Sequence, residues 1–187
     1  MSPARTLILV DGSQRSLLAC GFVRESLTGQ GRAPDDPSNP DSRGPLVLPF
    51  TSMPHLDEQR VDAILRHAEM FSMRVVECIP DLPIGLAAND AEDEAHRLLA
   101  ATYLAAGLGC DEVLWPAGAS TGDNLDLDRI AQINDTALLV SRLVALNSAQ
   151  HGVPAVHVSA PFSQLTESQV LDLVMDMDLP IEACCAG

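Results

Sequence analysis

The sequence predicts an α/β fold in three layers, with a five-stranded, mainly parallel sheet covered by helices on both faces. Short apolar runs alternate with longer segments of helical periodicity along the 187 residues. The apolar runs are continuous, as in strands buried on both faces of a parallel sheet. With 47% hydrophobic and 20% charged residues the chain can bury a core, and its length favours one domain over residues 1–187.

Each expected strand is followed along the chain by an expected helix. The run Thr-Leu-Ile-Leu-Val at 6–10 ends in Asp-Gly-Ser, and a helix with a regular apolar side follows it. Loops rich in Gly and Pro, over 29–45 and 80–91, separate the next elements. The expected strands are 6–10, 46–48, 74–79, 112–115 and 155–158. The expected helices are 16–27, 57–72, 92–108, 126–150 and 167–177.

The charge of the chain excludes several classes of function. All eleven basic residues are arginines, against 26 acidic residues, and the net charge is −15. Such a charge repels phosphate backbones, so nucleic acids and anionic membranes are not expected partners. Without lysine there is no Schiff base and no Walker A loop. The apolar run at 7–10 is too short for a signal peptide or a membrane span, and a cytoplasmic location is expected.

The cysteines and histidines do not predict a metal site. Five cysteines at scattered positions fit reduced, buried thiols better than a disulfide framework. Adjacent Cys184 and Cys185 cannot form a four-ligand zinc site alone, because structural zinc needs separated pairs. The histidines show no ligand spacing with them; they are His55, His67, His96, His151 and His157.

The loop after the first strand is the candidate ligand site. In open α/β sheets ligands bind beyond the carboxyl ends of the strands, where a helix N-terminus attracts anions. The candidate phosphate-binding residues are Asp11, Gly12, Ser13, Arg15 and Ser16. The same residue types also occur in any strand-to-helix turn, with a serine capping the helix, so a purely structural role stays open.

This loop resembles the opening of the PP-loop ATP pyrophosphatases, whose motif Ser-Gly-Gly-x-Asp-Ser follows the first strand. Residues 159–182 are similar to the "TPL…LTKAEIV…LGVPLE" stretch of one branch, 7-cyano-7-deazaguanine synthase. The spacing of residues 50–79, and of Gly118 and Asp123, also fits that family. The resemblance implies an adenine nucleotide α-hydrolase-type, Rossmann-like fold, ATP or AMP with magnesium as ligand, and a homodimer.

The chain departs from the family at signature positions. Asp11 and Ser13 replace the leading Ser and the second Gly, and Arg15 stands where the family has its Asp. The family's lysine in "TKAE" is Glu167, and its four zinc cysteines are reduced to Cys184 and Cys185. Arg15 inverts the charge at its position, although it could still meet a phosphate as a bidentate donor. The zinc site is expected to be lost.

A second group of polar residues follows the fourth strand. Gly118 and Ser120 are expected to line the ligand crevice, together with Asp123, the position that the resemblance also marks. Asp123, Asp126 and Asp128 lack the spacing of an EF-hand and are interpreted as acidic residues at a helix start.

Two hypotheses about function remain. The first is a diverged relative of 7-cyano-7-deazaguanine synthase that keeps the scaffold and binds a nucleotide or purine-like ligand without the full ATP-dependent ligase activity. The alternative is an active, AMP-forming ligase that activates a carboxylate and adds nitrogen. The changes at Arg15, Glu167 and the zinc cysteines favour the first.

Overall fold

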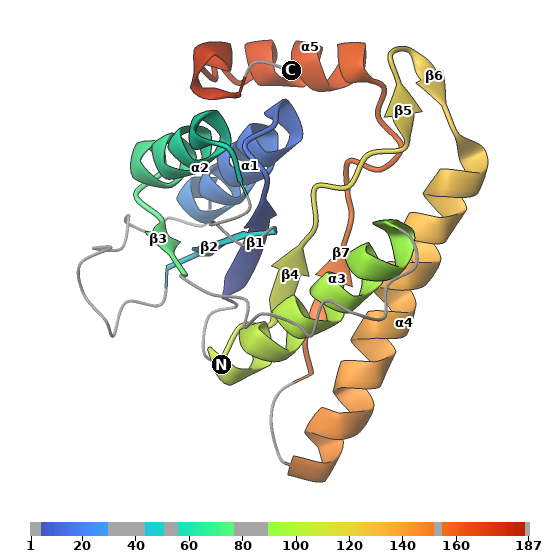
Figure 1. Cartoon of the computed structure of the whole chain (residues 1–187). Coiled ribbons are helices and arrows are strands. Elements are labelled where there is room, and N and C mark those ends of the chain that lie inside the picture. Colours follow the sequence, from blue (N-terminus) through green and yellow to red (C-terminus); the bar gives the residue numbers. More distant parts are fainter. Residues whose placement is uncertain (1–4, 30–43, 51–55, 77–89, 152–154, 186–187) are drawn as a thin grey trace.

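The computed structural model describes residues 5–29, 44–50, 56–76, 90–151 and 155–185. A five-stranded sheet in the order β3-β2-β1-β4-β7 forms its centre, and every strand pair in it is parallel (Figure 1). The strands are β1 (Thr6–Val10), β2 (Leu46–Pro49), β3 (Arg74–Val75), β4 (Glu112–Leu114) and β7 (His157–Ser159). The predicted α/β fold with a parallel five-stranded sheet is confirmed.

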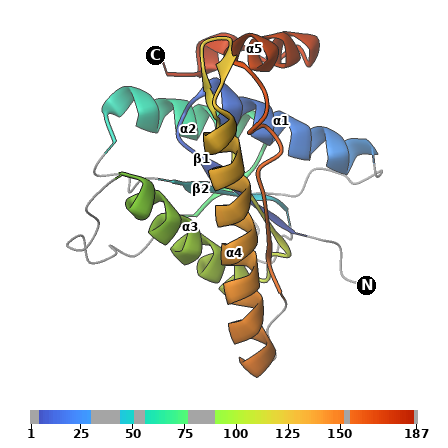
Figure 2. The same ribbon diagram turned by 90° about the vertical axis from the view of Figure 1, so that its right-hand side faces the viewer.

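Helices cover both faces of the sheet. They are α1 (Gln14–Gly29), α2 (Glu58–Met70), α3 (Asp90–Gly107), α4 (Leu127–His151) and α5 (Glu167–Asp176). Leu7 and Leu9 of β1 belong to the hydrophobic core that includes α3 and α4, whereas Ile8 and Val10 belong to the core on the side of α1, α2 and α5. All four side chains are fully buried, because successive residues of a strand point to opposite faces. The three predicted layers follow from this alternation (Figures 1 and 2).

The order of the strands reverses at β1. From β1 the chain adds β2 and β3 on one side, then crosses over and adds β4 and β7 on the other. The loops after β1 and β4 therefore leave the sheet toward opposite faces and open a crevice between them. The predicted candidate residues follow these two strands directly.

Apart from shifts of one or two residues at the ends of other elements, the structure differs from the predicted elements in four places. β3 is described only as Arg74–Val75, and positions 77–79 of the expected strand lie outside the described residues. β7 begins at His157 instead of 155, because it pairs with β4, which starts only at Glu112. The expected turn over 116–124 contains a short antiparallel hairpin, β5 (Ser120–Thr121) with β6 (Asn124–Leu125). A 3-10 turn, η2 (Ile181–Ala183), follows α5.

Most of the two Gly- and Pro-rich loops, at 30–43 and 80–89, lies outside the described residues. Within the described ranges, no helix has the length and apolar character needed to cross a membrane.

Candidate functional site

The loop after β1 is closed by hydrogen bonds of its own side chains. One oxygen of the Asp11 carboxylate, Oδ1, accepts hydrogen bonds from the backbone N–H of Ser13 at 3.0 Å and from the hydroxyl of Ser16 at 2.5 Å. Ser16 Oγ accepts in turn from the N–H of Asp11 at 3.0 Å. Gly12 supplies the left-handed turn, with φ of 82°. The Asp11 carboxylate thus lies at the N-terminus of α1, where an anionic ligand would also be attracted.

Ser13 caps α1, since its Oγ accepts from the N–H of Ser16 at 3.3 Å. The capping role that the sequence left open for this loop is therefore present. Of the backbone N–H groups, the Ser13 hydroxyl accepts only from that of Ser16, so the backbone N–H groups of Gln14 and Arg15 have no acceptor in the described part of the chain. These two donors are the part of the helix N-terminus that remains for a ligand.

Arg15 ties three segments of the chain together. Its Nη1 donates to the carbonyl of Phe162 at 2.8 Å, and its Nη2 donates to the carbonyl of Leu165 at 2.9 Å and to Ser120 Oγ at 2.7 Å. Burial lowers the pKa of Arg15, and the nearby Glu167 and Asp11 carboxylates oppose that shift. Arginine stays protonated under these conditions, so Arg15 is a half-buried cation whose donors are largely occupied by the protein itself.

Gly118 lies against the guanidinium of Arg15. A Cβ built at this position would lie 2.8 Å from Arg15 Cζ and closer still to Nε. A side chain here would therefore displace Arg15 from its three acceptors. Gly118, Ser120 and Arg15 form one packed unit that joins the β4 loop to the start of α1.

A cavity of about 580 Å³ opens at this edge of the sheet. Of the residues predicted from sequence, it is lined by Asp11, Ser13, Arg15, Gly118 and Ser120. Gly12 and Ser16 belong to the same loop, but they do not line the cavity. The other lining residues are Leu9, Val10, Gln14, Phe50, Arg60, Glu94, Trp115, Pro116, Ala117, Glu167, Val170 and Cys185.

Asp123 lies apart from this cavity. It is exposed in the β5–β6 turn, and its Oδ1 accepts a hydrogen bond from the hydroxyl of Ser168 in α5 at 2.5 Å. This contact fixes the hairpin to the helix. Asp126 caps the start of α4 by accepting from the N–H of Arg129 at 3.0 Å, which confirms its interpretation as a helix-start residue.

Sequence reasoning missed an aromatic pair and a cation at the cavity. Phe50 and Trp115 follow β2 and β4, and their ring centroids lie 6.4 Å apart at an angle of 42°. Arg60, in the first turn of α2, keeps half of its side chain exposed and forms a loose pair with Asp57 at 3.5 Å. The aromatic residues could have been found, because both directly follow an apolar run; nothing near Arg60 in the sequence marks it.

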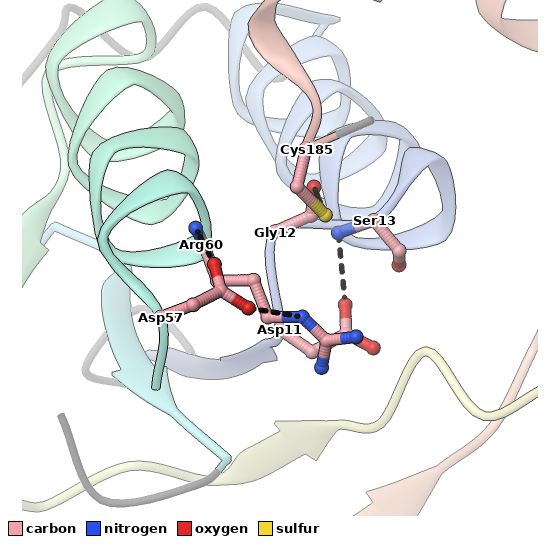
Figure 3. Close-up of polar contacts among 6 residues, drawn as sticks. All are labelled: Asp11, Gly12, Ser13, Asp57, Arg60 and Cys185. Carbon is pink, nitrogen blue, oxygen red and sulfur yellow. Dashed lines mark hydrogen bonds and ion pairs between the residues drawn. The ribbon is translucent and has the colours of Figure 1, made fainter. Parts of the chain in front are cut away.

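The segment after η2 returns to the loop after β1. The N–H of Cys185 donates to the carbonyl of Gly12 at 3.0 Å, and its thiol donates to the same oxygen at 3.2 Å (Figure 3). His67 of α2 is fully buried, and neither ring nitrogen has a hydrogen-bond partner in the described part of the chain. Burial lowers the pKa of His67 to about 4, although the Asp11 carboxylate acts in the opposite direction.

The cysteines of the described residues do not converge. Cys20 and Cys110 are buried in the cores on opposite faces of the sheet, and burial raises their pKa to about 12 and about 11. Burial also raises the pKa of Cys184 to about 11. No group of three His, Cys, Asp or Glu within the described ranges is arranged to hold a metal ion. The predicted burial of the cysteines is thus confirmed for Cys20 and Cys110, whereas Cys184 and Cys185 are only partly buried.

Comparisons with known proteins support the fold. A scan against protein-family models finds no match. A search of curated protein sequences also finds none. Among solved structures, the U34-tRNA thiolase NcsA from Methanococcus maripaludis, with its 4Fe-4S cluster, is similar with a TM-score of 0.57 and 15% identity. The match covers 98% of this chain and 62% of the thiolase chain, so this chain spans less than two thirds of its length.

At this level of identity the likeness concerns the fold. It agrees with the strand order 3-2-1-4-7 and with a Rossmann-like fold.

Proposed function

We propose that this chain is a diverged PP-loop-type protein, resembling 7-cyano-7-deazaguanine synthase, that binds a nucleotide or purine-like ligand without the full ATP-dependent ligase activity. The cavity of about 580 Å³ at the carboxyl edge of β1 and β4 carries this proposal. Its size lies in the range of small-molecule sites, and it lies at the strand-order reversal where α/β sheets bind ligands.

The walls of the cavity suit a base and an anionic group. Phe50 is partly exposed at the cavity and packs against the buried Trp115, and purines stack on such aromatic rings. Arg60 offers a guanidinium with half of its side chain exposed, and Gln14 and Arg15 offer backbone N–H groups at the start of α1. A monophosphate or carboxylate between Arg60 and α1 would have charge-assisted donors on two sides.

The same walls disfavour the alternative, an active ligase. The Asp11 carboxylate already accepts a hydrogen bond from the N–H of Ser13. The Arg15 guanidinium already donates hydrogen bonds to Phe162, Leu165 and Ser120. A triphosphate would have to displace these contacts or lie beside a fixed negative charge. Three carboxylates line the cavity, and Glu94 is paired with Arg129. If magnesium accompanied a nucleotide, Asp11 and Glu167 would be the residues to hold it, and the ion would supply charge neutralisation of the phosphates.

The tRNA substrate in the name of the structural relative is not proposed for this chain. With 26 acidic and 11 basic residues, the chain has a net charge of −15, which disfavours binding to an RNA backbone. The proposed partner is therefore a small molecule.

Isothermal titration with AMP and with ATP, each with and without magnesium, tests the proposal. We expect heat of binding for AMP. Arg60→Ala should weaken it about tenfold, the effect of one charge-assisted hydrogen bond. Arg66→Ala is the matched control, because Arg66 lies on the same helix, is exposed and does not line the cavity.

Absence of heat for every nucleotide would refute nucleotide binding, and titration with guanine would then test a purine-like ligand. Pyrophosphate release from ATP in the presence of a carboxylated deazaguanine and ammonium would instead establish the alternative, an active ligase.

A further inference from the structure

The outer face of α4 carries large apolar side chains that no described element covers. Leu139, Leu143 and Leu146 are 64%, 44% and 67% exposed. Their spacing of four and three residues places them in one stripe along the helix. Leu138, 47% exposed, lies beside the stripe. Figure 2 looks onto this helix, and no described element lies in front of it.

The opposite face of α4 already belongs to the core. Ile133, Val140 and Val144 are buried against the sheet and α3. An amphipathic surface helix normally places polar residues on its outer side. The exposed leucines of α4 are therefore not needed for packing within the monomer. Contiguous exposed apolar surface of this kind marks a contact with another molecule.

Two charged residues accompany the stripe, seven residues apart. Asp135 and Arg142 are both exposed, and neither forms an ion pair within the described ranges. Residues spaced by seven lie on nearly the same side of a helix. Leu139 lies between them along the helix axis.

We propose that this face is the interface between two copies of the chain, with the two α4 helices antiparallel about a two-fold axis beside Leu139. In this arrangement Asp135 of one copy lies level with Arg142 of the other, and the symmetry forms the pair twice. Leu138 and Leu139 of both copies surround the axis, and Leu143 and Leu146 extend over the partner's helix.

Charge favours a second copy at this particular face. A net charge of −15 makes two copies repel one another over most of their surfaces. Asp135 and Arg142 are the only charged residues between positions 130 and 149 of the sequence, and their charges cancel. The stripe therefore combines apolar area with minimal repulsion, and it lies away from the residues that line the cavity.

Sedimentation velocity over a range of protein concentrations tests the proposal. The wild type should sediment as a dimer, and Leu139→Glu should sediment as a monomer. Met175→Glu is the matched control, because Met175 is 53% exposed on α5, outside the proposed face, and it should leave the dimer intact. Circular dichroism verifies that each variant is folded.

Charge reversal tests the antiparallel pairing itself. Asp135→Arg and Arg142→Asp should each weaken the dimer by about tenfold, because each places like charges opposite one another twice. The double variant should regain the wild-type affinity, and so should an equimolar mixture of the two single variants as a heterodimer.

A monomeric wild type at all concentrations would overturn the proposal and leave the face to a different partner. A dimer that Leu139→Glu leaves intact would place the interface elsewhere. A dimer that is sensitive to Leu139→Glu but unaffected by both charge reversals would refute the antiparallel arrangement.

Discussion

Arg15 shows how a single residue type can be compatible with two roles. From sequence it could donate to a phosphate, and its charge replaces that of an aspartate in the resembled family. In the structure its donors hold Phe162, Leu165 and Ser120, residues that are 105 to 150 positions away. The sequence identified the residue but not its acceptors, because two of them are backbone carbonyls that any residue could present.

The close approach of Gly118 to Arg15 leads to a stability prediction. Gly118→Ala should lower the free energy of unfolding by about 1–3 kcal/mol, because the new Cβ displaces a guanidinium with three hydrogen bonds. Urea denaturation measures the change. Gly107→Ala is the control, since no atom lies within 4 Å of its Cβ position.

Gly118→Ala should lower the free energy of unfolding by less in the Arg15→Ala variant than in the wild type. If Gly118→Ala costs as much in the Arg15→Ala background as in the wild type, the contact with the guanidinium is not its cause.

His67 is predicted to make stability depend on pH. Its pKa is about 4 in the folded chain, against an ordinary 6.5 when unfolded. Below pH 6.5 the unfolded chain therefore binds a proton that the folded chain does not. The contribution of neutral His67 to the free energy of unfolding is fully present above pH 6.5. It is lost as the pH falls toward 4, and the loss amounts to about 2–3 kcal/mol.

Comparison with His67→Leu isolates this contribution from the carboxylates that titrate in the same range. The variant should lose less stability than the wild type between pH 7 and pH 4.5, as measured by urea denaturation. His157→Gln, at an exposed position, should keep the wild-type dependence. Parallel curves for wild type and His67→Leu would show that His67 is not buried in its neutral form.

At the scale of elements, local signals explain what could be predicted. Helix starts and the apolar faces of helices are encoded within a few residues, and all five expected helices are present. The β5–β6 hairpin was missed because its two-residue strands show no periodicity. It is held by distant contacts, such as Asp123 with Ser168 and Ser120 with Arg15.

The capping box at the start of α5 is a local sequence signal whose contribution to stability can be measured. Thr166 and Gln169 form a capping box, in which the Thr166 hydroxyl accepts from the N–H of Gln169 and the Gln169 side chain accepts from the N–H of Thr166. Thr166→Ala should cost about 1 kcal/mol in the free energy of unfolding, whereas Thr166→Ser should cost little. Equal melting temperatures for the two variants would contradict the role of the cap.

At the scale of the whole molecule, the order of strands and helices was enough to predict the layers and the parallel sheet. It also predicted candidate residues at the edge of the sheet where the cavity lies, since that edge follows from the fold class. The residues that complete the cavity could not be predicted. Arg60, Glu94 and Cys185 come from separate parts of the chain and meet there only after packing.

The contact between Cys185 and Gly12 has a consequence for how the protein is made. It joins positions 173 residues apart, so it can form only after almost the entire described chain has left the ribosome. The strands on either side of the cavity can pair earlier, while translation continues. The loop after β1 therefore obtains these hydrogen bonds only after all five strands of the sheet have been synthesised, and a nascent chain can form the sheet before Cys185 completes the lining of the cavity.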